Sequence, residues 1–254
     1  MNYLHGQLNY AVYAYAQSYP NGYIEDMHQH DRIQLLHTLS GVIHVQTAEG
    51  IWVIPPTKGI WIPENKKHSI TIFGEVEARG VFVEPFARAD LNTQCSVVAI
   101  PKLLSELINQ AVEIKTDVLP HTRNERLLEL ILDELRFLKE IPFQLPEAQS
   151  SLLKKICNNI KKDLSIIPSL SDIAKQYHLS TKTLSRLFQK EMNLSFSIWL
   201  KQAKILQALT DLEMKKSILN IALDLGYSSP SAFSYMFKRE MGMTPTEYIN
   251  KKYY

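Results

Sequence analysis

The stretch "GYSSPSAFSYMFKREMGMTPTEYI", residues 226–249, decides the architecture of the C-terminal part of this 254-residue chain. Ser229 followed by Pro230 is the pattern of a helix N-cap with proline at the first helical position. Phe233 and Phe237 are four residues apart, so they lie on one face of that helix. Short polar and basic side chains occupy the other face. The stretch therefore predicts a short helix with a packed back and an exposed polar front.

An earlier copy of the same pattern shows that the C-terminal part is an internal repeat. The segment "LSTKTLSRLFQKEMNLSF" at 179–196 aligns with "SSPSAFSYMFKREMGMTP" at 228–245. In the same way "SLSDIA" at 169–174 aligns with "SILNIA" at 217–222. Each copy predicts two short helices set across a turn, which is a helix-turn-helix unit.

Local signals place the parts of each unit. Serines at 169, 180, 217 and 229 stand where helix N-caps are needed. The turns fall at "YHL" (177–179) in the first unit and at Gly226 in the second. Between the units, "SFSIWLKQAKILQALTDLE" (195–213) predicts one long connecting helix.

The second helix of each unit presents side chains suited to DNA. A recognition helix needs short polar or basic groups that reach base edges and phosphates. The outward positions are Lys182, Thr183, Ser185, Arg186 and Gln189 in the first unit, and Ser231, Ser234, Tyr235 and Lys238 in the second. Arg186 is the strongest candidate for direct readout, because a guanidinium pairs with guanine through two hydrogen bonds.

The charge distribution agrees with this interpretation. The formal net charge of the chain is only +2. Residues 150–254, however, carry 16 Lys and Arg against 8 Asp and Glu, whereas residues 1–100 carry 6 against 9. A basic C-terminal part behind an acidic N-terminal part is typical of polyanion binding by the former.

These features together resemble a known family. Residues 151–252 look like the DNA-binding domain of the AraC/XylS transcription regulators, which implies two units that enter successive major grooves. The resemblance implies base or phosphate contacts for Lys182, Ser185, Arg186, Ser231, Ser234 and Tyr235. Two positions depart from the family pattern, since His178 and Asn193 stand where glycine is often found. Asparagine tolerates the left-handed conformation, so the second departure is conservative.

The first hundred residues predict a different kind of domain. Short segments rich in Val, Ile, Trp and Phe alternate with Gly, Pro or Asn, which indicates a β-sandwich or small barrel. The predicted strands are "VIHVQT", "IWVIPP", "GIWIP", "SITIF" and "RGVFVEP". Trp52, Trp61 and Phe82 are candidates for an apolar pocket, although core packing is the more common role of such side chains.

A histidine pattern suggests a site within this domain. Gly22, His28, His30, Gln34 and Gly41 have a spacing similar to the first cupin motif, with Gln in place of the usual Glu. The segment "PENKKH", which ends at His68, resembles the second motif. Positions 28, 30 and 34 share strand parity and would point into a barrel. His37 and His44 fall outside the motif and are expected to be surface or satisfied strand histidines.

Three interpretations of this cluster stay open. His28, His30, His68 and Gln34 would hold a divalent metal such as Zn, Fe, Ni or Mn. They would equally line a metal-free polar pocket for a small-molecule effector, or form a merely structural cluster. The uncharged Gln weakens the first interpretation, because it brings no negative charge to a cation.

The segment 101–149 lies between the two parts. "PKLLSELINQAVEI" predicts a helix, and Thr122 with Glu125 predicts a capping box before a second one. Leu128, Ile131, Leu135 and Leu138 then form one apolar stripe. This stripe would pack within its own domain or on a second copy of the chain. "EIPFQLPEAQS" (140–150) is interpreted as an interdomain linker.

The sequence therefore predicts an α+β chain in three parts. We expect a cupin-like β-barrel that senses an effector (1–100), a helical linker with a possible role in homodimer formation (101–149), and an all-α DNA-binding domain with two helix-turn-helix units (150–254). We expect a sequence-specific transcriptional regulator, either activator or repressor, whose partners are promoter DNA and a small-molecule effector. The stretch "GIWVIPPTKGIWIPENKKHSI" (50–70) resembles regulators that often control a neighbouring efflux-type transporter.

The rival class is a metal-dependent cupin enzyme with an attached helical module. The basic C-terminal part and the doubled helix-turn-helix favour the regulator, because an enzyme would need neither. No apolar run approaches the ~20 residues of a membrane helix, and the N-terminus does not have the basic start of a signal peptide. We therefore expect a cytoplasmic protein that does not bind membranes. The unpaired spacing of Cys95 and Cys157 fits a reducing compartment.

Overall fold

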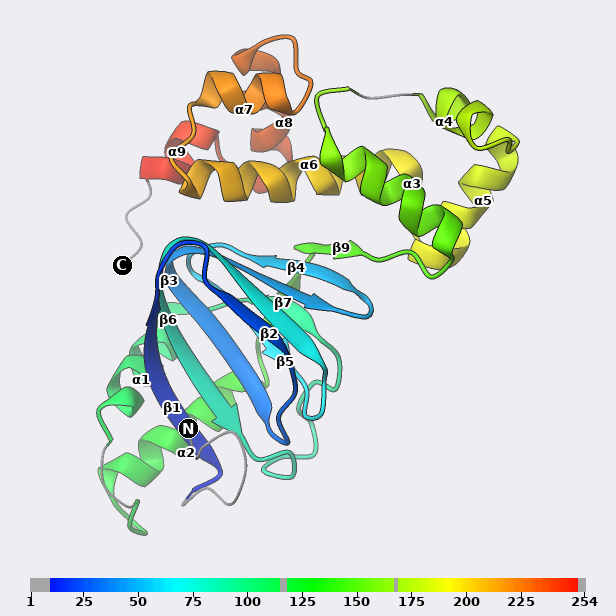
Figure 1. The fold of residues 1–254 in the computed structure, drawn as a ribbon. Coiled ribbons are helices and arrows are strands. Elements are labelled where there is room, and N and C mark those ends of the chain that lie inside the picture. The colour runs from blue at the N-terminus through cyan, green and yellow to red at the C-terminus, as the bar shows by residue number, and fades with distance from the viewer. Residues whose placement is uncertain (1–9, 115–117, 167–168, 251–254) are drawn as a thin grey trace. The chain divides into compact units, whose positions relative to one another are not determined.

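The computed structural model describes residues 10–114, 118–166 and 169–250. The chain divides into two compact units, with the boundary between Phe143 and Gln144. The short segment Ala48–Ile51 belongs to the second unit, although it lies within the sequence of the first. The expected order of an antiparallel, cupin-like β domain followed by an all-α domain is confirmed (Figure 1).

A curved antiparallel sheet forms the first unit (Figure 1). Its strands are hydrogen-bonded in the order β1-β6-β3-β5-β7-β8, and β2 pairs with β6 while β4 pairs with β3. The two longest strands, β3 and β6, run side by side from the pair Ile33↔Val83 to the pair Gln46↔Ser69. The strands are β1 (Val12–Tyr19), β2 (Ile24–His28), β3 (Ile33–Thr47), β4 (Gly50–Ile54), β5 (Lys58–Ile62), β6 (His68–Val83), β7 (Ser96–Ala99) and β8 (Lys139–Ile141).

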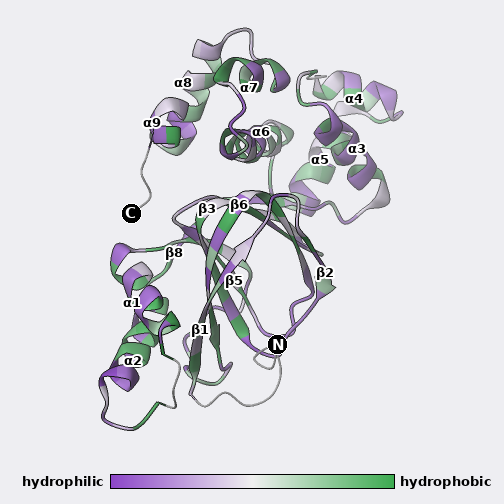
Figure 2. Ribbon diagram, turned by 60° about the vertical axis from the view of Figure 1, so that its left-hand side comes forward, coloured by the Kyte–Doolittle hydropathy of each residue, from purple (hydrophilic) through white to green (hydrophobic). Residues whose placement is uncertain are grey.

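Alternation along these strands produces one core on each side of the sheet. Leu36, Ile43 and Ile70 belong to the cluster inside the curved sheet. Leu35 and Val81 belong to a second cluster on the outside, which helices α1 (Lys102–Val112) and α2 (Arg123–Leu135) complete. Figure 2 shows hydrophobic and hydrophilic positions alternating along α1 and α2, as expected of helices that pack on one face.

The apolar stripe of the middle segment is therefore buried within the chain. Leu128, Ile131 and Leu135 belong to the outer cluster, and Leu138 packs against it. Thr122 caps α2 as expected, but the Glu125 carboxylate accepts from the His121 N–H rather than from that of Thr122.

Two strand predictions need correction. "SITIF" and "RGVFVEP" were separated by a glycine and acidic residues, yet they belong to the single 16-residue strand β6. A left-handed glycine, Gly74, with φ of +77°, lies within this strand. The segment interpreted as a linker also holds two short strands, β8 and β9 (Gln144–Pro146), and β8 adds to β7 at the edge of the sheet.

The second unit is helical after β9. Its helices are α3 (Ser151–Lys162), α4 (Leu170–Gln176), α5 (Thr181–Met192), α6 (Phe196–Glu213), α7 (Ile218–Asp224), α8 (Pro230–Met241) and α9 (Pro245–Asn250). Helices α3 to α8 each begin behind a serine whose side chain accepts a backbone N–H of the first turn. The N-caps expected at 169, 180, 217 and 229 are therefore confirmed, as is Pro230 at the first helical position.

The long helix α6 holds the two helix-turn-helix units together. Phe188 of α5 packs edge-on against Trp199 of α6, with ring centroids 5.8 Å apart. On the side of the second unit, the buried Lys204 donates to the carbonyl of Leu225 at the end of α7, at 2.5 Å. Helix α6 therefore contacts both units, through α5 in the first and through the end of α7 in the second.

A close approach also joins the second turn to the segment after α3. Gly226 has φ of +71°, and a side chain there would overlap the carbonyl of Ser165. Only glycine combines this left-handed backbone with this lack of space. The first turn has no glycine, and His178 adopts φ of +54° instead. Asn193 ends α5 in the left-handed conformation, with φ of 55°.

Candidate functional site

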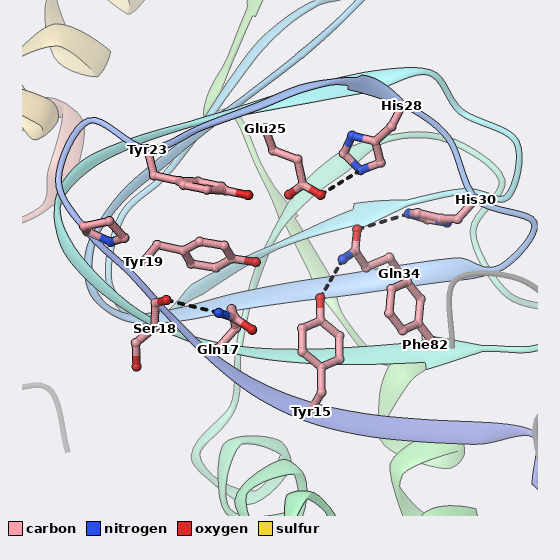
Figure 3. A pocket seen from close by; sticks show the side chains of 11 residues that line it. Tyr15, Gln17, Ser18, Tyr19, Tyr23, Glu25, His28, His30, Gln34 and Phe82 are labelled. Atoms are coloured by element: carbon pink, nitrogen blue, oxygen red, sulfur yellow. Dashed lines mark hydrogen bonds and ion pairs between the residues drawn. The ribbon is translucent and has the colours of Figure 1, made fainter. Parts of the chain in front are cut away.

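A cavity of about 380 Å³ lies in the first unit, against β1, β2, β3 and β6 (Figure 3). Its volume falls in the range of small-molecule sites. The lining residues are Tyr15, Gln17, Ser18, Tyr19, Pro20, Tyr23, Glu25, His28, His30, Gln34 and Phe82. Three of the four residues proposed for an effector or metal site, His28, His30 and Gln34, are therefore in its wall.

Strand β1 supplies one wall because its alternate residues face the cavity. Tyr15, Gln17 and Tyr19 line it, whereas Val12 and Ala14 face the outer core. Tyr15 lies opposite Gly80 in the register of β1 and β6. A side chain at Gly80 would overlap the Tyr15 ring, so the glycine makes room for the tyrosine to lie flat across the sheet.

A polar network crosses the floor of the cavity (Figure 3). Gln34 bridges the Tyr15 hydroxyl, at 2.6 Å, and His30 Nε2, at 3.2 Å. The Tyr15 ring stacks on Phe82 with ring centroids 5.2 Å apart and planes 19° apart. His30 is buried, and burial lowers the pKa of its imidazole, which favours the neutral ring. The floor is therefore polar and hydrogen-bonded.

The histidines expected to form one site do gather. The rings of His28 and His68 have centroids 4.2 Å apart, and those of His30 and His68 are 5.2 Å apart. Each of the three rings places Nδ1 against a backbone carbonyl two residues away, at 2.8 Å for His28, 2.6 Å for His30 and 2.8 Å for His68. At His68, a neutral ring that donates from Nδ1 keeps a lone pair on Nε2.

His68 differs from the other two because it is fully buried and does not line the cavity. Burial lowers the pKa of its imidazole to about 4. Its Nε2 is buried without a hydrogen-bond partner. An orphaned lone pair on a neutral imidazole is a group that a metal ion or a hydrogen-bond donor would satisfy.

The placement of these side chains favours the metal interpretation less than the pocket interpretation. Within the described part of the chain, no set of three or more His, Cys, Asp or Glu side chains is placed to hold a metal ion. The fourth expected ligand, Gln34, has its amide committed to Tyr15 and His30. The lining suits an organic molecule better than an ion held by four ligands.

Of the remaining aromatic and histidine candidates, one lines the cavity and the others pack elsewhere in the first unit. Phe82 lines the cavity, whereas Trp52 packs in the inner core and Trp61 in the outer one. His37 is a buried strand histidine whose Nδ1 lies 2.9 Å from the Lys58 carbonyl, and His44 packs on Phe73. Neither of these two histidines reaches the cavity.

Sequence reasoning missed the larger part of the lining. Tyr15 and Tyr19 are at even spacing in "YAYAQSY" (13–19), which is a usable strand signal for one face. Glu25 and His28 differ in parity and would point to opposite faces of a regular strand. The register of β2 against β6 shifts between these two residues, and Figure 3 shows both side chains directed toward the cavity.

The nine expected DNA-contacting residues all lie on the recognition helices α5 and α8. Their side chains are exposed, except for the half-buried Ser234, while Leu184, Phe188, Phe233 and Phe237 form the buried backs of the helices. Thr183 is engaged locally, since its hydroxyl lies 2.8 Å from that of the N-cap Ser180. The described residues contain no helix that is long and apolar enough to cross a membrane.

Comparison with known proteins identifies both units. Residues 9–138 match the AraC-like ligand binding domain family, and residues 173–251 match a helix-turn-helix domain family. The HTH-type transcriptional regulator NimR of Escherichia coli is 30% identical over 223 residues, which cover 88% of this chain and 81% of that protein. The HTH-type transcriptional activator RhaR of Mannheimia succiniciproducens is 29% identical over 102 residues, 40% of this chain and 37% of its own.

A solved structure was found for the C-terminal unit as well. The DNA-binding domain of AdpA in complex with a target DNA is similar, with 25% identity and a TM-score of 0.37. It covers 39% of this chain and 91% of its own.

Proposed function

The chain belongs to the AraC family of transcriptional regulators, and from that premise we propose that the cavity of the first unit receives an effector that changes promoter binding by the second. Its relatives are regulators and not enzymes. The chain is accordingly a DNA-binding regulator with a ligand-binding domain.

The cavity is the observation that carries the proposal. It is formed by residues inside the ligand-binding domain match, and polar groups on its floor are already joined to one another. An effector acts on DNA binding only if its affinity differs between two arrangements of the chain. The experiment is a promoter-binding titration with and without each compound of a small-molecule library, repeated with Gln17→Trp, which fills the cavity.

The recognition helices supply the DNA side of the proposal. We propose that Arg186 reads a base and that Lys182 neutralises a phosphate, since both are exposed on α5. Arg186→Ala should lower specific affinity about tenfold or more, because a bidentate base contact contributes about 1–3 kcal/mol. Arg123→Ala on α2 of the first unit removes the same charge and serves as the control. Equal affinity of the two variants for the promoter would contradict the role of Arg186.

A metal-sensing function is the second candidate. It is supported by the shared Nδ1 hydrogen bonds of the three histidines and by the orphaned Nε2 of His68. A bound Zn, Fe, Ni or Mn ion would supply a positive centre that recruits a chelating effector. The test is the metal content of protein never exposed to chelator or nickel resin, beside the double variant His28→Ala/His68→Ala.

The regulatory output is proposed from resemblance alone. We propose a neighbouring efflux-type transporter gene as a target, action in the cytoplasm where the promoter lies, and a homodimer as the binding species. A reporter fused to the adjacent gene distinguishes activation from repression by its response to deletion of the regulator. Sedimentation of the purified chain measures whether it is a dimer.

A further inference from the structure

The described lining of the cavity holds one carboxylate and neither of the strongly basic side chains, Lys and Arg. That carboxylate belongs to Glu25. The nearby Arg32 is buried and is paired with Glu84, with Nε 3.0 Å from Oε1. An anionic effector would therefore enter the cavity without a countercharge, which disfavours it.

Glu25 is available to a ligand. Its side chain is 33% exposed, and its carboxylate lies 3.7 Å from His28 Nε2, within ion-pair distance of a protonated ring but beyond hydrogen-bond distance. The irregular register of β2 directs the carboxylate into the cavity rather than away from it (Figure 3). A regular strand with His28 facing inward would point residue 25 outward. The bulge therefore has a definite result, which is to add one negative charge to the wall.

The rest of the wall is rich in aromatic rings and oxygen acceptors. Tyr15 stacks on Phe82, and Tyr19 packs against Tyr23 with ring centroids 5.2 Å apart. Figure 3 shows the Tyr19 and Tyr23 hydroxyls directed toward the same space as Glu25. Aromatic faces and phenol oxygens both attract cations. The floor beneath them is formed by the uncharged amide of Gln34 and by His30, whose pKa burial lowers.

We propose that the effector is an organic cation, in which an ammonium group pairs with Glu25 and an apolar body packs on the tyrosine rings. This inference rests on the proposed function, because it assigns a chemical class to the effector of the same cavity. It excludes carboxylates and phosphates as effectors of this protein. It also makes Glu25 the residue that determines selectivity for charge.

A series of three compounds of nearly equal size isolates the charge. The probes are 2-phenylethylammonium, 2-phenylethanol and phenylacetate, titrated into the full-length protein at pH 7 and followed by saturation-transfer NMR. We expect the ammonium to bind about tenfold more tightly than the alcohol, and phenylacetate to bind least. Glu25→Gln should bring the ammonium and the alcohol within about twofold of each other while leaving the alcohol unchanged.

Two controls make the result specific. Glu106→Gln removes an exposed carboxylate on α1, away from the cavity, and should keep the tenfold preference. Gln17→Trp fills the cavity and should abolish binding of all three probes. Equal affinities of the ammonium and the alcohol in the native chain, or an unchanged preference in Glu25→Gln, would overturn the inference.

Failure of this inference is distinct from failure of the proposed function. If phenylacetate or phenylethanol binds best and Gln17→Trp abolishes that binding, the cavity is an effector site of another charge class. If none of the probes binds, the cation inference is overturned. The comparison of Arg186→Ala with Arg123→Ala reports on promoter binding independently, because neither residue lies in the cavity.

Discussion

Replacing Gly80 with alanine should damage the cavity through a single side chain. The new methyl group would occupy the position of the Tyr15 ring, so the ring must leave. Its departure breaks the hydrogen bond with Gln34, which contributes about 1 kcal/mol. It also breaks the stack on Phe82, which contributes about another 1 kcal/mol. Strain in the displaced ring adds about 1 kcal/mol. Alanine returns about 0.5–1 kcal/mol through its better strand propensity. We expect a net loss of about 2 kcal/mol.

A double-mutant cycle tests this reasoning. In a Tyr15→Ala background the obstacle is gone, so Gly80→Ala should stabilise the first unit by about 0.5–1 kcal/mol. The assay is urea unfolding followed by tryptophan emission in a Trp199→Phe chain, which leaves Trp52 and Trp61 of the first unit as reporters. Additive losses in the double variant would refute the assignment, because they would show that the methyl group meets something other than Tyr15.

Three further predictions concern the pH dependence of stability and substitutions at the two turns, His178→Gly and Gly226→Ala. The folded-state pKa of His37 and of His68 is about 4, below the ordinary 6.5, so the unfolded chain binds protons first as pH falls. The free energy of unfolding should therefore be greatest above pH 6.5. Toward pH 4 it should fall by up to about 1.4 kcal/mol per pH unit for each histidine. Urea titrations at several pH values measure this decline, which should be shallower for His37→Gln. His178→Gly should raise the stability of the second unit by about 1 kcal/mol without weakening promoter binding. The reason is that glycine adopts the left-handed backbone of this exposed position without the steric cost that histidine has. A variant that is less stable than the native chain would contradict this. Gly226→Ala should destabilise that unit by more than about 2 kcal/mol, since it combines a left-handed backbone with a clash. Urea unfolding followed by the loss of helical circular dichroism, in the chain that keeps Trp199, measures this change. If Gly226→Ala is as stable as the native chain, the segment around Ser165 moves aside at little cost and the reasoning is wrong.

The helical half was predictable because its signals are local. A serine cap and the three residues after it specify a helix start within one turn, which is why the N-caps at Ser169, Ser180, Ser217 and Ser229 could be placed from sequence. The same short-range periodicity separated the buried phenylalanines from the outward polar residues. Exposure of a side chain on a short amphipathic helix follows directly from its position in the repeat.

The sensor half was predictable only where strand parity suffices. His30 and Gln34 are four residues apart and face the same way, as expected. Glu25 reaches the cavity through a register shift that depends on the partner strand, and nothing in its own neighbourhood signals it. The freedom of Tyr15 to lie flat depends on Gly80, which is 65 positions away in the chain and adjacent only in the folded sheet. Non-local pairings of this kind determine the lining of the cavity.

The contact between the second turn and the carbonyl of Ser165 has a consequence for the DNA that the protein selects. Because Gly226 packs there, and because Phe188 of α5 and the end of α7 both contact α6, we expect the two helix-turn-helix units to keep a fixed separation. One added base pair between half-sites advances the second by about 3.4 Å and turns it by about 34° around the duplex axis. About five would carry it to the opposite side. Binding should therefore depend on the number of base pairs between the half-sites. Insertions in the spacer that alter no contacted base should abolish binding as effectively as mutations within the half-sites.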